Sequence, residues 1–325
     1  MHRPLAIERV EDGLTVVRVP NLVPVPWRLK ASYPWIQAVE RWRLRTFLGK
    51  LPGEYRPSYR GTVNFDYTRP WLQGMNLSPR SVYICNDDFT LFALSQTAKN
   101  LVRRQIRACA KQACRTFITS KEYQDLVGLS GRATVLVPGH SHAVPATPPP
   151  LPKAPPIRVG FVGHIDKRLD LDLIQRAASD GELALHFIGK FDGESSRDRL
   201  NHMPNVHLHE PLFEADLFEW MLSMHVLWMP YALPKDWAES VTTPNKTLSY
   251  FATGRPIVVT GLSQAPEVDG VAADLYRGPE PISSFLKGVV ARDTAACAEQ
   301  RLVIGRRYTA DQTFKPIAEA LGVKF

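Results

Sequence analysis

A lysine that follows two threonines marks a segment able to bind phosphate, around Lys246. Thr243 can cap a helix, and Pro244 suits the first helical position, where its missing N–H costs nothing. The first turn of a helix offers free N–H groups and the positive end of the helix dipole. With the charge of Lys246 and the hydroxyls of Thr242 and Thr243, these groups can hold a phosphate. The alternative is an ordinary capped helix whose lysine is solvated.

Two adjacent acids, Asp87 and Asp88, follow an apolar run that ends at Cys85. A carboxylate at the end of a strand could accept the proton of an attacking hydroxyl in a displacement reaction. The same pair could instead cap a following helix. The residues leave both interpretations open.

Two alternating histidines, His140 and His142, stand in a Gly-His-Ser-His motif. Imidazole is a common zinc ligand, but a zinc site takes three or four protein ligands and the sequence indicates no third one here. We therefore expect no metal site.

Tryptophan and basic residues alternate over residues 27–50. Trp35, Val39 and Trp42 have helical spacing, and arginines flank them. This pattern is typical of a helix that lies on an anionic bilayer. A half-buried core helix with basic residues facing solvent explains the pattern equally well.

Composition describes a globular chain of 325 residues, 44% hydrophobic, with a formal charge of +8. This length allows two domains. The charge suits a nucleotide, a polyanion or an anionic membrane surface, but no nucleic-acid-binding module is recognisable and we expect no nucleic acid partner. Four cysteines without CxxC pairing, no signal peptide pattern and no apolar run of about 18 residues predict a cytoplasmic protein.

A proline-rich connector divides the chain into nearly equal halves. Residues 145–156 contain seven prolines, which exclude helix and favour an extended segment. We therefore predict domains over residues 1–144 and 157–325.

The second half alternates apolar strand patterns with helical ones. Such βα repeats predict a parallel sheet covered on both faces, with ligands bound beyond the carboxyl ends of the strands. Gly163, His164 and Tyr231 would lie there. Gly160 and Gly163 do not form a GxGxxG motif, so a dinucleotide oxidoreductase is excluded. The predicted strands are 158–164, 183–189, 206–209, 226–230 and 257–260, and the predicted helices are 169–178, 217–224, 282–291, 295–305 and 310–321.

The first half has fewer regular patterns. Its predicted strands are 14–19, 61–65, 81–85 and 115–118, and its predicted helices are 35–47 and 98–113.

The segment from 243 to 260 resembles the donor site of nucleotide-sugar-dependent glycosyltransferases of the GT-B fold (glycosyltransferase group 1, family 4-like). The matching residues are Pro244, Lys246, Tyr250, Ala252, Gly254 and Pro256. Arg168, before a Leu-Asp-Leu-Asp-Leu run, also matches an arginine of relatives. The motifs match the family closely from residue 157 to about 290. Before residue 145 the match is weaker and is limited to segments 82–89 and 135–139.

This resemblance implies an α/β protein of two Rossmann-like domains facing a cleft, with the last helix crossing back to the first domain. The C-terminal domain would bind a nucleoside-diphosphate sugar as co-substrate, without a metal, and the N-terminal domain a saccharide or lipid-linked acceptor for polysaccharide or glycolipid synthesis. Asp87 and Asp88 would lie near the transferred sugar. The implied donor-binding residues are Gly163, His164, Arg168, Thr242, Thr243, Lys246, Ser249 and Tyr250, and the implied cleft-lining residues are His140, His142 and Tyr231.

The chain departs from the family pattern at two acidic positions. The glutamate that grips the ribose in relatives falls at Ser249, and the earlier acid falls at Val241. Serine offers one short hydroxyl where a carboxylate accepts hydrogen bonds from both ribose hydroxyls. The usual first unit of strand, glycine-rich loop and helix is also not found. The alternative is therefore a non-catalytic GT-B protein that binds or regulates a partner.

Overall fold

The structure is a computed structural model in which the chain forms two compact units. Unit 1 comprises Met1–Leu136 and Pro316–Phe325, and unit 2 comprises Val137–Lys315. Trp27, Arg28 and Thr242 lie outside the residues that the structure describes. The described residues are 6–11, 14–18, 26, 29–30, 33–51, 61–75, 77–93, 95–153, 155–191, 194–241 and 243–323.

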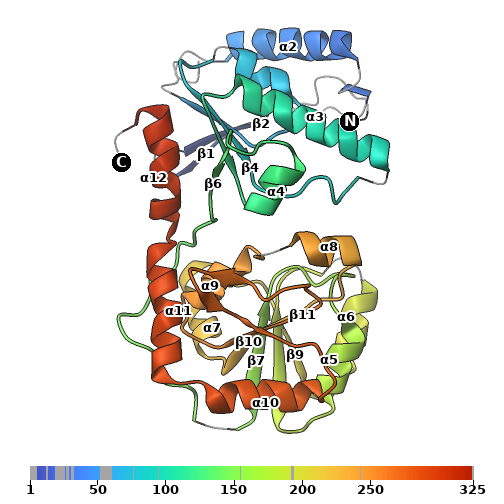
Figure 1. The fold of residues 1–325 in the computed structure, drawn as a ribbon, viewed down its shortest axis with the longest axis vertical. Helices are drawn as coiled ribbons and strands as arrows, with labels where there is room; N and C mark the ends of the chain where they lie inside the picture. The colour runs from blue at the N-terminus through green and yellow to red at the C-terminus, as the bar shows by residue number, and fades with distance from the viewer. Residues whose placement is uncertain are drawn as a thin grey trace. The chain divides into compact units, whose positions relative to one another are not determined.

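Unit 2 is built on a six-stranded sheet of order β14-β11-β10-β7-β8-β9 (Figure 1). Every pairing between these strands is parallel. The chain adds β8 and β9 on one side of β7 and then returns to add β10 and β11 on the other. The order therefore reverses between β7 and β10, where a parallel sheet opens a crevice for ligands. The strands are β7 Ile157–Val162, β8 Leu183–Ile188, β9 Val206–His209, β10 Val226–Pro230, β11 Ile257–Thr260 and β14 Asp274–Leu275.

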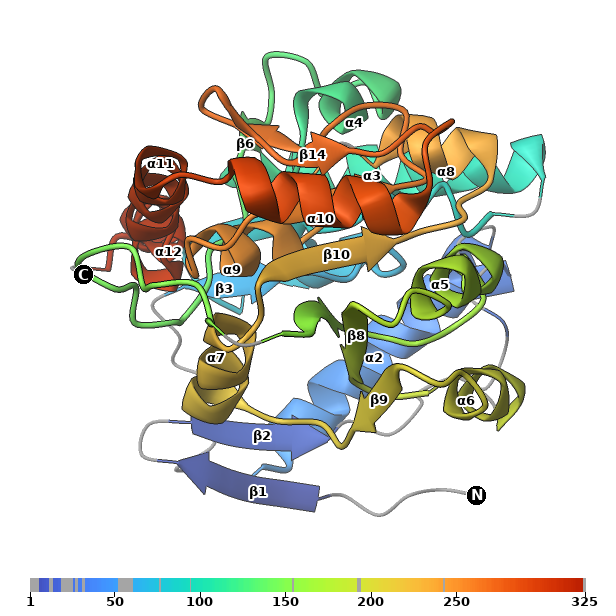
Figure 2. The same ribbon diagram turned by 90° about the horizontal axis from the view of Figure 1, so that it is seen from below.

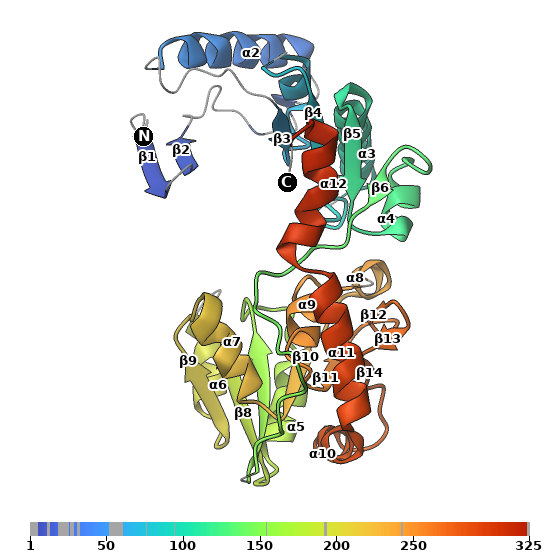
Figure 3. The same cartoon turned by 90° about the vertical axis from the view of Figure 1, so that its left-hand side faces the viewer.

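Helices cover both faces of this sheet, as the βα pattern predicts. One face packs against α5 Leu171–Ala178, α6 Glu194–Asn201 and α10 Ile282–Arg292. The other packs against α7 Glu214–Leu222, α9 Lys246–Phe251 and α11 Ala295–Arg307. A short helix, α8 Lys235–Ser240 (Figure 2), and the antiparallel pair β12 Glu267–Val268 and β13 Val271–Ala272 (Figure 3) complete unit 2.

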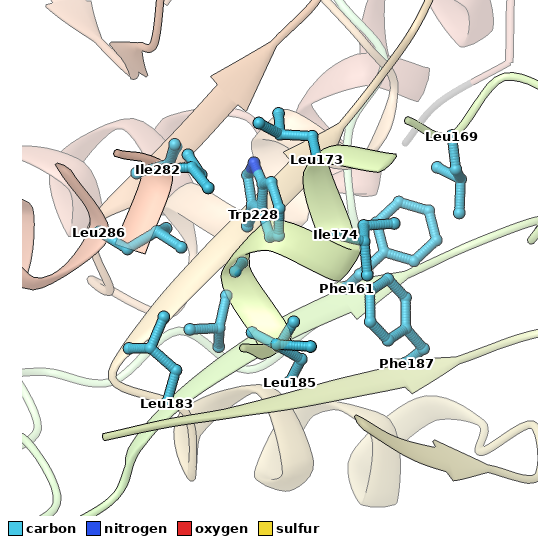
Figure 4. Packing of buried hydrophobic residues seen from close by; sticks show 14 of the residues in the cluster. Phe161, Leu169, Leu173, Ile174, Leu183, Leu185, Phe187, Trp228, Ile282 and Leu286 are labelled. Carbon is cyan, nitrogen blue, oxygen red and sulfur yellow. The ribbon is translucent and has the colours of Figure 1, made fainter. Parts of the chain in front are cut away.

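Strand β10 shows how both faces become buried. Val226 and Trp228 belong to the core on the α5 face, whereas Leu227 and Met229 belong to the core on the α9 face. Successive side chains of a strand point to opposite faces, so a continuous apolar run fills both cores. Figure 4 shows Trp228 among side chains of the α5 face, including Leu173 and Ile282.

Unit 1 contains a four-stranded parallel sheet of order β3-β4-β5-β6. Residues of β4, including Tyr83 and Cys85, pack with the helix α3 on one face, while Val82 and Ile84 pack with Ile317 of α12 on the other. The elements are β3 Thr62–Asn64, β4 Ser81–Cys85, β5 Arg115–Ile118, β6 Thr134–Val135, α2 Pro34–Gly49, the 3₁₀ helix η2 Pro70–Met75, α3 Gln96–Gln112, α4 Lys121–Leu126 and, from Pro316 onward, α12 Ala310–Leu321. An antiparallel hairpin, β1 Ala6–Glu11 and β2 Leu14–Arg18, precedes them (Figure 3). The predicted α/β class with parallel sheets covered on both faces is confirmed.

The proline-rich segment is extended, but it lies along unit 2. Arg306 donates to the carbonyl of Pro145 at 2.9 Å, and Arg255 donates to those of Pro149 and Pro150 at 3.1 and 3.0 Å. His225 Nε2 lies 2.9 Å from the Pro152 carbonyl oxygen. The two units consequently divide between Leu136 and Val137, ahead of the proline-rich segment. The functions predicted for the two parts stay predictions.

The helix that carries Lys246 begins later than predicted. Its N-cap is Asn245, in helical conformation and without a side-chain cap, so the predicted Thr243 cap is wrong. The Thr247 N–H donates to the Pro244 carbonyl at 2.8 Å, which makes Pro244 part of a preceding turn. The end of the helix agrees with the prediction, because Gly254 has a φ of 70°.

Within the described residues, no helix is long and apolar enough to cross a bilayer.

Candidate functional site

The edge of the sheet at the reversal of strand order is bordered by loops that follow β7 and β10. The backbone N–H of Ala232 donates to the Arg168 carbonyl at 2.8 Å, and that of Asp170 donates to the Pro230 carbonyl at 2.8 Å. Leu169 and Tyr231 form an isolated β-bridge between the same loops. These bonds hold the loop after β7 against the end of β10, and they place Arg168 and Tyr231 at this edge of the sheet.

Lys246 reaches the same edge from α9. Its Nζ lies 4.1 Å from the centre of the Phe161 ring and 5.5 Å from that of Tyr231. Burial and, to a smaller extent, the positive charge of Arg168 lower the pKa of Lys246 to about 7, although Asp166 opposes the shift. A cation in such surroundings gains most from an anionic ligand, because the aromatic faces replace little of its lost hydration.

Arg168 is held in place by Asp166. The Arg168 Nε lies 3.0 and 2.9 Å from the two carboxylate oxygens, and Nη2 lies 2.6 Å from Oδ2. Burial raises the pKa of Asp166, but the hydrogen bonds and charge of Arg168 outweigh it, so the pKa is lowered overall. The carboxylate therefore stays ionised and fixes the guanidinium two residues along the chain.

Gly163 leaves the space that Lys246 occupies, and Gly189 allows the backbones after β7 and β8 to lie close together. A Cβ on Gly163 would lie 2.5 Å from the Lys246 Nζ, and a Cβ on Gly189 would lie 1.9 Å from the Gly163 carbonyl oxygen. Both have positive φ, 140° and 147°, which side-chain-bearing residues rarely adopt. Only glycine fits at either position without movement of its neighbours.

Tyr250 supports the site from below. Its ring is fully buried, and its hydroxyl accepts a hydrogen bond from the Val162 N–H at 2.9 Å. This contact holds the last residue of β7, directly before Gly163. The other predicted donor residues in this part of the chain are Thr243 and Ser249, both half-buried, and His164, which is exposed.

The predicted acids lie in unit 1, at the end of β4. Asp88 Oδ1 accepts hydrogen bonds from the Thr90 N–H at 3.0 Å and the Thr90 hydroxyl at 2.5 Å. Asp88 thus caps the turn that follows the strand. The sequence suggested that the acid pair could cap a helix, and the structure has a turn at this position instead. Asp87 is exposed.

His140 and His142 contact α7 and α11. His140 Nε2 lies 2.9 Å from the Gly305 carbonyl oxygen, and the His142 ring stacks on Phe218 at 4.7 Å. Burial lowers the pKa of both, that of His142 to about 4, so both are neutral at pH 7. Among the residues that the structure describes, no three His, Cys, Asp or Glu side chains are grouped to hold a metal ion.

Two residues of the site were not found from the sequence. Phe161 supplies the ring under Lys246, yet its strand position indicates only a core residue. Asp166 precedes Arg168 by two residues, and an aspartate that bonds to the backbone N–H two positions later was a usable signal.

Comparisons with known proteins identify the domain that holds this site. Residues 156–291 match the family model described as "Glycosyl transferases group 1". A search among curated proteins gives no match.

Three of the solved structures with a similar fold are those of HepE, WaaG and GtfA. Anabaena Alr3699/HepE in complex with UDP is 13% identical, with a TM-score of 0.63 over 86% of this chain and 82% of that one. WaaG, a glycosyltransferase of lipopolysaccharide biosynthesis, is 16% identical, with a TM-score of 0.52 over 79% and 82%. The pneumococcal O-GlcNAc transferase GtfA, in complex with UDP and GlcNAc, is 9% identical, with a TM-score of 0.56 over 87% and 60%.

These findings confirm the predicted resemblance and the GT-B fold. The match to the model of glycosyl transferases group 1 covers residues 156–291, which lie in unit 2, and it supports the predicted enzyme class. The sequence identities to these solved structures are low, so the similarity concerns the fold alone.

Proposed function

We propose that this protein transfers a sugar from a nucleoside-diphosphate sugar to a saccharide or a lipid-linked saccharide. The single observation that carries the proposal is the position of Lys246 and Arg168 at the reversal of strand order in a glycosyltransferase group 1 domain. HepE has been crystallised with UDP and with UDP-glucose, so a uridine diphosphate is the first donor to test.

The chemistry needs positive charge at the leaving group. The bond between the sugar C1 and the diphosphate oxygen breaks, its electron pair leaves with the diphosphate, and an acceptor oxygen forms the new bond to C1 while its hydroxyl proton passes to a base. In our proposal Lys246 and Arg168 contact the diphosphate and stabilise the charge that develops on it. Asp166 keeps the guanidinium oriented throughout.

The remaining donor contacts come from groups near α9 and the loop after β7. We propose that Thr242, Thr243 and Ser249 supply hydroxyls, that His164 and the backbone of Gly163 border the diphosphate, and that Tyr231, His140 and His142 line the substrate cleft. Tyr250 acts by holding the end of β7. The donor needs no resident metal in this scheme, because the two cations carry the charge compensation.

Asp87 and Asp88 are proposed to lie near the transferred sugar on the acceptor side. Asp87 is exposed, and Asp88 Oδ1 accepts hydrogen bonds from Thr90. In our proposal one of the two carboxylates contacts a hydroxyl of the substrate. Either retention or inversion at C1 is compatible with this arrangement.

We further propose polysaccharide or glycolipid synthesis at the cytoplasmic face of a membrane as the setting. The basic surface of the helix α2, with two exposed tryptophans, supports it. No nucleic acid partner is proposed.

A non-catalytic GT-B protein is the second candidate. Ser249 and Val241 favour it, because neither offers the carboxylate that grips the ribose in relatives. Lys246 is half-buried, with its Nζ over the rings of Phe161 and Tyr231 and its pKa lowered, and this position favours an anion site in either case.

Isothermal titration calorimetry with UDP and UDP-glucose, followed by a panel of GDP- and dTDP-sugars, tests the proposal. We expect one donor to bind, and Lys246→Met to weaken it by about 10- to 100-fold, the value of one charge-assisted hydrogen bond. Lys121→Met, at an exposed lysine of unit 1, is the control for lost charge and should bind as the wild type does.

Three results are informative. Binding by no donor rejects the enzyme, and equal binding by both lysine variants rejects the site. Binding without hydrolysis or transfer, with a mixture of saccharide acceptors, supports the non-catalytic candidate.

A further inference from the structure

Helix α2 of unit 1 has two unlike faces. The inner face carries Ile36, Glu40 and Leu44, all buried, and Leu44 packs with Trp71 and Met75 beneath it. Trp35 and Trp42 are on the outer face and are 66% and 65% exposed. The tryptophans are therefore not part of the core.

The only acid of α2 is withdrawn from its outer face. Glu40 is fully buried, and its Oε1 accepts a hydrogen bond from the Lys30 ammonium at 2.6 Å. Arg69 lies 3.8 Å from the other carboxylate oxygen. The sequence from Pro34 to Gly49 contains no other aspartate or glutamate, so the charged side chains that α2 itself places on its outer face are all basic.

Aromatic and basic side chains are ordered on that outer face. At 3.6 residues per turn, Trp35, Val39 and Trp42 fall within an arc of about 60°. Arg43 and Arg45 lie roughly 80° to either side of Trp35 on the same projection. Val39 is 37% exposed, and both arginines are exposed. An apolar ridge is therefore bordered by cations on both sides.

A recess lies beside this ridge. It has a volume of about 370 Å³ and is lined by Pro34, Gln37, Ala38, Arg41, Trp42 and Arg45. Arg41 and Arg45 are four residues apart on one helix, where like charges repel each other. No ion pair joins either of them to an acid within the described part of the chain. An anion in the recess would relieve the repulsion.

We propose that the outer face of α2 docks on an anionic lipid bilayer, with Trp35, Val39 and Trp42 at the level of the headgroups and a lipid phosphate in the recess between Arg41 and Arg45. Tryptophan suits the membrane interface because its ring is apolar and its indole N–H is polar. Guanidinium groups bind phosphate with paired hydrogen bonds. The inference rests on the membrane setting proposed above, but it needs neither donor binding nor catalysis.

The charge pattern favours a bilayer over a protein partner. A protein interface of stable size has charged residues depleted at its centre, whereas here four cations (Arg41, Arg43, Arg45 and Lys50) surround three apolar side chains within four turns of helix. Each cation near an anionic membrane adds to the attraction, and this attraction falls as salt is raised.

Sedimentation with lipid vesicles tests the proposal with the full-length protein. One set of vesicles contains phosphatidylcholine with about one third phosphatidylglycerol, and the other contains phosphatidylcholine alone. We expect binding to the first set only. Arg41→Gln with Arg45→Gln should weaken partitioning roughly 30-fold, from about tenfold or less for each cation. Trp35→Ala with Trp42→Ala should weaken it at high as well as low salt.

Matched controls separate this surface from general charge and hydrophobicity. Lys121→Gln with Arg132→Gln removes two exposed cations elsewhere in unit 1, and Phe213→Ala removes a side chain of unit 2 that is 74% exposed. Both should partition within about twofold of the wild type. Thermal unfolding of every variant checks that it is folded, and all changed side chains except Arg41 are exposed.

The proposal is overturned if the wild type ignores anionic vesicles, or if the controls lose binding as strongly as the α2 variants. It is also overturned if the protein is a dimer that Trp35→Ala with Trp42→Ala dissociates, because the face is then a protein interface. Vesicle binding by a protein that binds no nucleotide sugar rejects only the proposed enzyme, and the reverse result rejects only the docking surface.

Discussion

The Lys246 ammonium lies over the face of the Phe161 ring, with Nζ 4.1 Å from the ring centre. The nearby carboxylate, Asp166, is bonded to Arg168 through both oxygens. The edge of the sheet therefore holds two cations and one anion, a positive excess that burial makes costly until an anionic ligand arrives. The cost of burying the charged Lys246 can be tested without a ligand.

Stability should rise with pH because of Lys246. In the folded protein its pKa is about 7, and the ordinary value for lysine is 10.5. Between these values the unfolded chain binds the extra proton, so the free energy of unfolding increases as pH rises through 7. Below pH 7 both states are charged and the full cost of burying the ammonium is present. Urea unfolding at several pH values from about 6.5 to 9.5 measures the slope.

Lys246→Met is the reference for this slope. Methionine has a similar length and no charge, so the difference between wild type and variant isolates the lysine. The variant should be the more stable protein at pH 6.5, and its advantage should shrink towards pH 9.5. Parallel pH profiles for the two proteins would contradict a desolvated Lys246.

Gly163→Ala should damage the site more than the fold. The new Cβ would meet the Lys246 Nζ at 2.5 Å, and the backbone φ of 140° adds strain of about 1–3 kcal/mol. The lysine must move from its position over Phe161, so UDP affinity should fall at least as much as stability does. Gly181→Ala is the control, since nothing lies within 4 Å of its Cβ. Calorimetry and thermal unfolding compare them, and equal behaviour of both variants would refute the steric argument.

Much of unit 2 could be predicted from its sequence because its strands are short apolar runs between polar breaks. Strands β9, β10 and β11 begin and end at the predicted residues. One core lies on each face of such a strand, so the strand is apolar throughout and can be recognised from its local sequence alone. The helices α6 and α8 were missed because they are short and largely polar, and tertiary contacts rather than amphipathic spacing stabilise them.

The site was predictable in part for the same reason. Lys246 and Arg168 were found from the family pattern, whereas Phe161 looked like any core residue. Its role depends on the lysine reaching it from α9, a contact between positions 85 residues apart that no local pattern encodes. Asp166 and Arg168 are only two residues apart in the loop after β7, but the ion pair between them was not predicted.

The proline-rich segment was also predictable only in part. Composition predicts its extended conformation correctly, because proline fixes φ and removes a donor. Composition does not predict which carbonyl groups will find partners. Those carbonyls are bound by Arg255 and His225, each in a loop before a strand, and by Arg306 of α11.

Arg255→Lys should therefore loosen that segment. Arg255 is only 4% exposed, and its guanidinium donates to the carbonyls of Pro149, Pro150 and Leu222. A lysine ammonium cannot span three acceptors with a planar fork, so we expect a loss of about 1–3 kcal/mol in stability. Trypsin cleavage after the exposed Lys153 should also become faster. Arg176→Lys, at an exposed position of α5, should change neither quantity.

Tyr250→Phe tests whether the buried hydroxyl holds the end of β7. The substitution keeps the ring and removes the acceptor of the Val162 N–H bond, which is 2.9 Å long. A buried N–H without a partner costs about 1–3 kcal/mol, which urea unfolding resolves. Tyr276→Phe is the matched control. Its hydroxyl bonds to the Glu280 carbonyl at an exposed position, where water can replace it, so its loss should cost less than about 0.5 kcal/mol. Because Val162 precedes Gly163, Tyr250→Phe should also weaken UDP binding, and the control should not. A stability loss in Tyr250→Phe with unchanged UDP affinity would make Tyr250 a core residue without a positioning role.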